Sequence, residues 1–146
     1  GQALKDWFNL AVDRDTQAFN KVMDAFGLPK SSDEDKAARA AAILEANRGA
    51  TRVPLEVLER CQEAASLAAA MVAGGNPNSL SDAGVAGLCA VAAAKGAYYN
   101  VLINLDGLED PAFVAEMRGR ADAALKAVVD ATDGLEKDVL TRLMMA

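Results

Sequence analysis

Apolar residues recur at steps of three and four along most of the chain, which is the spacing of one helical face. In the first segment, Ala3 to Phe26, that face consists of Leu4, Phe8, Val12, Phe19, Val22, Met23 and Phe26. We expect this face to lie against the core. Gly27 and Pro29 should end the helix, because glycine caps helix C-termini and proline cannot continue one.

The same spacing predicts further helices at about 33–47, from Pro54 to the Gly74–Gly75 pair, at 81–103, at 111–130 and finally to Leu143. Ser31 or Ser32 can cap the second helix, with Glu34 and Asp35 at its positive end, and Gly49 would close it. Pro54 suits a first helical turn. Asp110 would cap the fifth helix, and the sequence Thr132-Asp133-Gly134 breaks or bends it. Since no stretch alternates with period two, we expect an all-α bundle of five to six helices in one domain, residues 1–146.

Small residues form one stripe of the helix at 81–103, where they would let another backbone approach closely. The stripe consists of Ala83, Gly87, Ala90, Ala94 and Ala97. The chain as a whole contains 32 alanines, and only 5% of its residues are aromatic. Alanine buries little area, so we expect a homodimer to add the buried surface that these side chains do not supply alone.

Composition excludes several kinds of chemistry. The chain has no histidine, which removes histidine general bases, Ser-His-Asp systems and nearly all zinc sites, so no metal is expected. The net charge of −6, without a basic stripe, argues against nucleic acid. No purely apolar run reaches the roughly 18 residues that span a bilayer, so no membrane is expected. Cys61 and Cys89 lie in apolar helical stretches and indicate two reduced, buried thiols of a cytoplasmic protein.

A polar loop precedes the helix at 81–103. It contains Asn76, Asn78, Ser79, Ser81 and Asp82. Turn formation and helix capping explain most of these residues. The alternative is a ligand site, in which backbone N–H groups and neutral side chains position a ligand and the Asp82 carboxylate accepts hydrogen bonds or acts as a base.

Asn100 and Asn104 share one face near the end of the same helix, where asparagine is unfavourable. They must find partners, and both a packed hydrogen-bond network and a ligand site satisfy that need. Asp82 lies on the same face as Asn100, but a straight helix separates the two by about 27 Å. Both contact one ligand only if it is long, or if an antiparallel second copy lies alongside.

Asp15 lies in the segment Asp15-Thr16-Gln17-Ala18-Phe19, and Lys30 follows the Pro29 stop. From the pattern alone, these two residues read as a solvated helix acid and a surface lysine. A functional interpretation of either residue needs a further observation.

The chain resembles the cyclodeaminase/cyclohydrolase family, which includes the cyclodeaminase domain of formiminotransferase-cyclodeaminase and bacterial methenyltetrahydrofolate cyclohydrolases. The first matching motif runs from DTQAF at 15–19 through Val22-Met23 to LPK at 28–30. The second comprises NPNSLSDAGVA at 76–86, Gly96-Ala97 and NVLINL at 100–105, with Pro54 and Cys61 at the expected places. The resemblance covers about residues 10–104.

The resemblance implies an all-helical homodimer that binds a tetrahydrofolate derivative as its substrate. It implies a lyase that converts 5-formiminotetrahydrofolate to 5,10-methenyltetrahydrofolate and ammonia, or a hydrolase that opens the methenyl form to 10-formyltetrahydrofolate. Without histidine, carboxylates must transfer the protons. We therefore predict Asp82 and Asp15 as the acid/base or pterin-anchoring residues. The residues predicted to position the folate are Asn76, Asn78, Ser79, Ser81, Asn100 and Asn104, with Lys30 at the glutamate tail.

The family usually begins with a helical segment that holds a Pro-Gly-Gly-Gly-Ser-like stretch, and the chain contains no counterpart of it. We therefore expect the natural protein to begin further upstream. This departure leaves a second hypothesis open, a non-catalytic helical dimer or a folate binder that has lost its chemistry.

Overall fold

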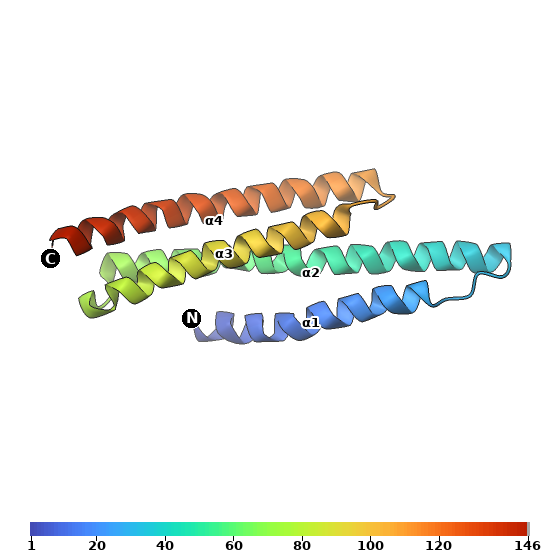
Figure 1. Cartoon of the computed structure of the whole chain (residues 1–146), viewed down its shortest axis with the longest axis horizontal. Coiled ribbons are helices and arrows are strands. Elements are labelled where there is room, and N and C mark those ends of the chain that lie inside the picture. Colours follow the sequence, from blue (N-terminus) through green and yellow to red (C-terminus); the bar gives the residue numbers. More distant parts are fainter. Residues whose placement is uncertain (146) are drawn as a thin grey trace.

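In the computed structural model, which describes residues 1–145, the chain forms four long α-helices and one short 3-10 turn. They are α1 (Gln2–Phe26), α2 (Asp33–Gly74), η1 (Pro77–Ser79), α3 (Leu80–Leu105) and α4 (Pro111–Met145). The helices lie along one common axis, with α2, α3 and α4 packed together and α1 against α2 (Figure 1). No strand occurs in this part of the chain, so the all-α prediction is confirmed.

The predicted break between the second and third helices is wrong, because α2 continues through both Gly49 and Pro54. Proline has no N–H and leaves the carbonyl four residues before it without a helical donor. Here that carbonyl belongs to Ala50, and it accepts a hydrogen bond from Asn104 Nδ2 at 2.9 Å. Pro54 is itself buried, so tertiary packing outweighs the low helix propensity of both residues.

The predicted break at Thr132-Asp133-Gly134 is also wrong, because α4 continues to Met145. Thr132 is buried, and its hydroxyl donates to the carbonyl of Val128 at 2.9 Å, inside the same helix. Beyond it, Leu135 and Val139 pack in an apolar cluster with residues of α2 and α3. The two missing breaks turn the expected five to six helices into the four that the described residues form.

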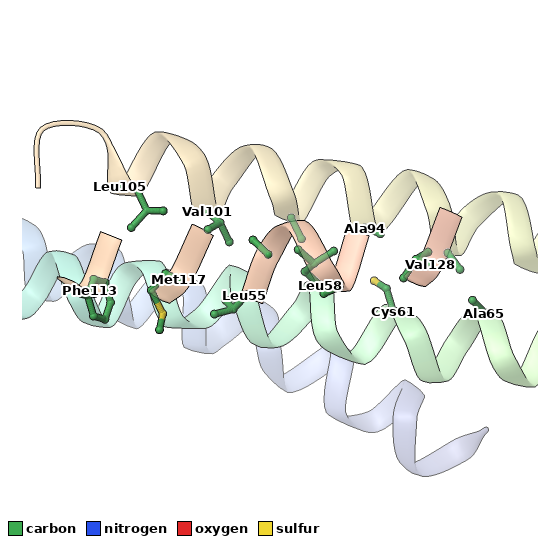
Figure 2. Close-up of a cluster of buried hydrophobic side chains, with 14 residues drawn as sticks. Leu55, Leu58, Cys61, Ala65, Ala94, Val101, Leu105, Phe113, Met117 and Val128 are labelled. Carbon is green, nitrogen blue, oxygen red and sulfur yellow. The ribbon is translucent and has the colours of Figure 1, made fainter. Parts of the chain in front are cut away.

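The main core lies between α2, α3 and α4 (Figure 2). Its largest fully buried members include Leu55, Leu58 and Val101. The small-residue stripe of α3 is buried at every predicted position, so this prediction is confirmed. Across it, Val128 of α4 lies beside Ala94 (Figure 2), and Leu135 of α4 packs directly against Gly87.

Helix ends and ion pairs fix the connections between the helices. Gly27 follows α1 as predicted, and Ser32 caps α2 in a reciprocal pair with Asp35, with both hydrogen bonds at 3.0 Å. Asp110 accepts from the Phe113 N–H at 3.2 Å, as expected of a cap, and also pairs with Arg48 of α2. These two contacts lower the pKa of Asp110, and the hydrogen bond from Arg48 is the larger cause.

The prediction for the apolar face of α1 is confirmed at Leu4, which is buried, and at Phe8, which packs against the main core, but it is wrong for most of the remaining face. Farther along, the helix packs on α2 through small residues, with Ala11 and Ala25 buried. Four large residues of the predicted face instead lie outward: Val12, Phe19, Met23 and Phe26 are all exposed, from 49% to 67%. We call these four residues the α1 apolar stripe. The expected core face fails because α1 has α2 as its only extensively contacted neighbour, and small residues allow that contact to be close.

One helical stretch, Pro77–Leu105, is long and apolar enough to cross a membrane by length and composition, with 28% of its most apolar 18-residue window buried. In the bundle this stretch packs its alanine stripe against α2 and α4. Its other side carries Leu88 and Cys89, both exposed. The prediction of two buried thiols therefore holds for Cys61 and is wrong for Cys89, because only one side of α3 faces the core.

Candidate active-site groove

The side chains of α1, α2 and α3 form a groove that runs along α2. The two helices that border it, α1 and α3, point in the same direction (Figure 1). It consists of two hollows of about 480 and 490 Å³ that share Phe8 of α1. The sequence assigned Phe8 to the core and missed it as a groove residue. The signal was available, because Phe8 lies seven residues before Asp15 and so on the same helical face.

The larger hollow brings together two predicted site residues, Asp15 of α1 and Asn100 of α3. Pro54 of α2 forms part of its floor. Asn100 Nδ2 donates to the Gly96 carbonyl at 3.0 Å, in its own helix. The Asn100 Oδ1 atom and the Asp15 carboxylate take part in no hydrogen bond within residues 1–145, so this hollow offers a set of unoccupied acceptors.

The other hollow contains Ser79 and Asp82 at the start of α3. Because α3 is one continuous helix, the 18 residues from Asp82 to Asn100 correspond to about 27 Å along its axis. Asp82 and Asn100 thus line the same groove, as their shared face predicts. Asp82 and Asp15, however, do not meet at one reacting atom within a single chain.

The remaining polar loop residues do not converge on the groove. The Asn76 side chain accepts from the Asn78 N–H at 3.0 Å and so caps η1, which is the capping interpretation. Asn78 is exposed and lines neither groove hollow. Ser81 lines a different hollow, between α3 and α4. The structure therefore divides the predicted loop site among three places.

Lys30 lies at the far end of α2, in a hollow with Lys36, Arg39 and Asn47. Asn47 precedes Pro54 by seven residues, so this basic hollow continues the α2 face that floors the groove. The basic hollow lies beyond the end of the groove that contains Asn100, and the Asp82 end of the groove points away from it. Lys30 and Asp82 are therefore well separated.

Two further features concern chemistry. Tyr98, which neighbours the groove residue Ala97, donates to Asp122 Oδ1 at 2.8 Å, and this hydrogen bond raises the pKa of Tyr98. It ties α3 to α4 rather than facing the groove. Among the described residues, no group of three or more cysteine and acidic side chains could hold a metal ion.

Comparison with known proteins shows what this arrangement is similar to. The pattern of the formiminotransferase-cyclodeaminase family matches residues 1–123. A methenyltetrahydrofolate cyclohydrolase from Methylorubrum extorquens is 51% identical over 102 residues, which are 70% of this chain and 49% of that protein. A formimidoyltransferase-cyclodeaminase from Sus scrofa is 39% identical over 115 residues, 79% of this chain and 21% of that one.

The fold leads to the same group of proteins. The crystal structure of formiminotetrahydrofolate cyclodeaminase from Thermotoga maritima superposes with a TM-score of 0.78 at 25% identity, covering 91% of this chain and 62% of that one. The chain spans about half the length of the cyclohydrolase that it matches. Sequence and fold agree, and the chain belongs to the formiminotransferase-cyclodeaminase family.

Proposed function

We propose that this chain is a folate-dependent enzyme of one-carbon metabolism and that the groove between α1 and α3 holds the folate. The observation that carries the proposal is that Asp15 and Asn100, which belong to different motifs and lie 85 residues apart in the sequence, line one hollow. The names of the relatives supply the substrate class, a tetrahydrofolate derivative. Two free thiols accord with a cytoplasmic location.

Asp15 is the proposed general base. In hydrolysis of the methenyl form, water adds to the carbon between N5 and N10, and the resulting tetrahedral carbon expels N5 and leaves the formyl group on N10. A carboxylate can take the proton from the water and return it to N5. In the deamination, N10 attacks the formimino carbon, and the same carboxylate can deliver a proton to the departing ammonia. The Asn100 Oδ1 atom would accept a hydrogen bond from a ring N–H and so orient the pterin.

The glutamate tail has a proposed place as well. A folate whose ring lies at Asp15 can extend past Asn100 toward the basic hollow of Lys30, Lys36 and Arg39. That hollow follows the groove along the same face of α2, and its three cations, which outnumber its single acid Glu109, suit a carboxylate. Ser79 and Asp82 would contact the folate from the other end of the groove, or from a second copy.

We propose that the second copy forms a homodimer through the α1 apolar stripe. Monomeric proteins rarely expose large contiguous apolar patches, and one member of this stripe, Val12, also lines the groove. With the twofold axis perpendicular to the helices, the second copy runs antiparallel, so its Asp82 would lie on the side of the first groove where Asp15 is found. Such an arrangement would supply a carboxylate beyond the Asp15 end of the groove, which one chain alone does not do.

The oligomeric state can be tested at Phe19, a member of the stripe that is 61% exposed. Phe19→Glu should shift the mass measured by light scattering from dimer to monomer, because it places a charge in an apolar interface. Gln17→Glu is the matched control, since Gln17 lies in the hollow on the other side of α1, toward Arg52. A monomeric wild type, or a dimer that survives Phe19→Glu, contradicts the proposed interface.

The activity can be tested with the two folates separately, because one reaction consumes the methenyl chromophore and the other forms it. The cyclohydrolase is the more similar of the two relatives, so loss of the chromophore from methenyltetrahydrofolate is the first expected result. Formation of the chromophore from formiminotetrahydrofolate would assign the deaminase reaction instead. No change above buffer with either folate would contradict the enzymatic proposal, and calorimetric binding without turnover would favour a degenerate folate binder.

A further inference from the structure

Pro54 interrupts the backbone hydrogen bonding in the middle of α2. It is buried within a helix of 42 residues, and it cannot donate to the carbonyl of Ala50. An unsatisfied backbone carbonyl at a partly buried position destabilises the fold, so the carbonyl requires a donor from elsewhere. The requirement arises at the floor of the groove, because Pro54 lines the hollow that contains Asp15.

Asn104 of α3 supplies the donor. Its Nδ2 atom lies 2.9 Å from the Ala50 oxygen, 54 positions away in the sequence. The contact is partly reciprocal. The hydroxyl of Thr51, a fully buried residue of α2, donates to the Asn47 carbonyl at 2.9 Å and lies 3.5 Å from the Asn104 carbonyl near the end of α3. At this point in the bundle, a side chain of each helix thus donates a hydrogen bond to a backbone carbonyl of the other.

We infer that Asn104 is a positioning residue, which holds the α3 side of the groove against α2 at Pro54 instead of binding the folate. The inference rests on the proposed function for the identity of the groove's ligand. The hydrogen bond from Asn104 to the Ala50 carbonyl does not depend on that proposal. Asn100 lies one turn earlier on α3 and lines the hollow, so the contact at Asn104 fixes where Asn100 lies relative to the α2 floor of that hollow.

Asn100 provides an internal comparison. Its amide also donates to a backbone carbonyl, that of Gly96, but this carbonyl keeps its ordinary helical donor, the N–H of Asn100 itself. Replacing the Asn100 side chain therefore leaves no backbone group without a partner. Replacing the Asn104 side chain leaves the Ala50 carbonyl without one, unless residue 54 regains an N–H.

The test combines Asn104→Leu with Pro54→Ala, because the second substitution restores the helical donor to the Ala50 carbonyl. With Pro54 present, Asn104→Leu should raise the unfolding equilibrium constant in urea by about tenfold. In the Pro54→Ala background it should raise that constant by less than about threefold. Asn100→Leu should have the same effect in both backgrounds. Equal effects of Asn104→Leu in both backgrounds overturn the inference, as does failure of the double variant to fold.

Folate affinity separates positioning from ligand contact. Calorimetric titration with 5-formyltetrahydrofolate should show weaker binding for Asn104→Leu, by about tenfold, and recovery of the affinity of Pro54→Ala in the double variant. A double variant that still binds much more weakly than Pro54→Ala shows that Asn104 contacts the ligand, and overturns the inference. If the wild type binds no folate, the proposed function fails, while the unfolding measurements continue to decide the role of Asn104.

Discussion

Gly87 of α3 lies tightly against Leu135 in the second half of α4, and this contact yields a prediction about stability. A Cβ added at Gly87 would lie 2.9 and 3.1 Å from the two methyl carbons of Leu135. Gly119, in the first half of α4, is exposed, and a Cβ there would meet nothing within 4 Å. The two glycines therefore separate the effect of a close contact from the general effect of glycine in a helix.

The magnitudes follow from these distances. Replacing a helical glycine by alanine stabilises a helix by about 1 kcal/mol when the space is free, which is the expectation for Gly119→Ala. At Gly87 the same gain is opposed by overpacking against Leu135, which typically costs about 1–3 kcal/mol. Gly87→Ala should therefore lower the free energy of unfolding by about 0–2 kcal/mol, at least about 1 kcal/mol below the control.

Urea denaturation monitored by circular dichroism measures both variants, with equal m-values as the check that only stability has changed. The contact itself is tested in a Leu135→Ala background, where the opposing methyl groups are gone. There, Gly87→Ala should stabilise the protein by about 1 kcal/mol, as Gly119→Ala does. If Gly87→Ala stabilises the protein equally with and without Leu135, the packing of α4 on α3 at this point is refuted.

Three further predictions concern the core and its ion pair. Arg48 lowers the pKa of Asp110, so the stabilisation from this ion pair is complete above the unfolded-state pKa of about 4 and is lost as the pH falls. Asp110→Asn should therefore flatten the decline of Tm from pH 5 to 3. A decline equal to that of the wild type would contradict this. Burial raises the pKa of Cys61 to about 11, so a thiol reagent at pH 8 should modify Cys89 alone until the protein unfolds, and rapid modification of both thiols would argue against this core. Leu58 is fully buried, so Leu58→Ala should cost about 3–5 kcal/mol in urea denaturation, and a cost below about 1 kcal/mol would contradict its burial.

Local signals in the sequence predict local features of this fold well. The small-residue stripe of α3 predicts its buried face, and the Ser32 cap is predicted from residues within one turn of it. The continuity of α2 could not be predicted in this way. Pro54 reads as a helix start, and the residue that satisfies the orphaned carbonyl, Asn104, lies 50 positions later.

In the candidate site, too, the sequence predicts individual residues but not how the helices bring them together. Asp15 and Asn100 were each predicted as site residues, but only the packing of α1 and α3 along α2 brings them into one hollow. The outward face of α1 was missed for a related reason. Periodicity identifies an apolar face such as that of Phe19 and Met23, but it does not tell whether the face meets the same chain or another one.

The most direct test of the central claim compares Asp15→Asn with Asp13→Asn, on whichever of the two folates the wild type converts. Asp13 is exposed, lies two residues away on α1 and lines neither hollow of the groove, so the two variants make the same chemical change. If the groove is the active site, Asp15→Asn should lower kcat by about 10²–10⁴-fold, while Asp13→Asn keeps the wild-type rate. Equal rates for the two variants would show that the chemistry takes place elsewhere.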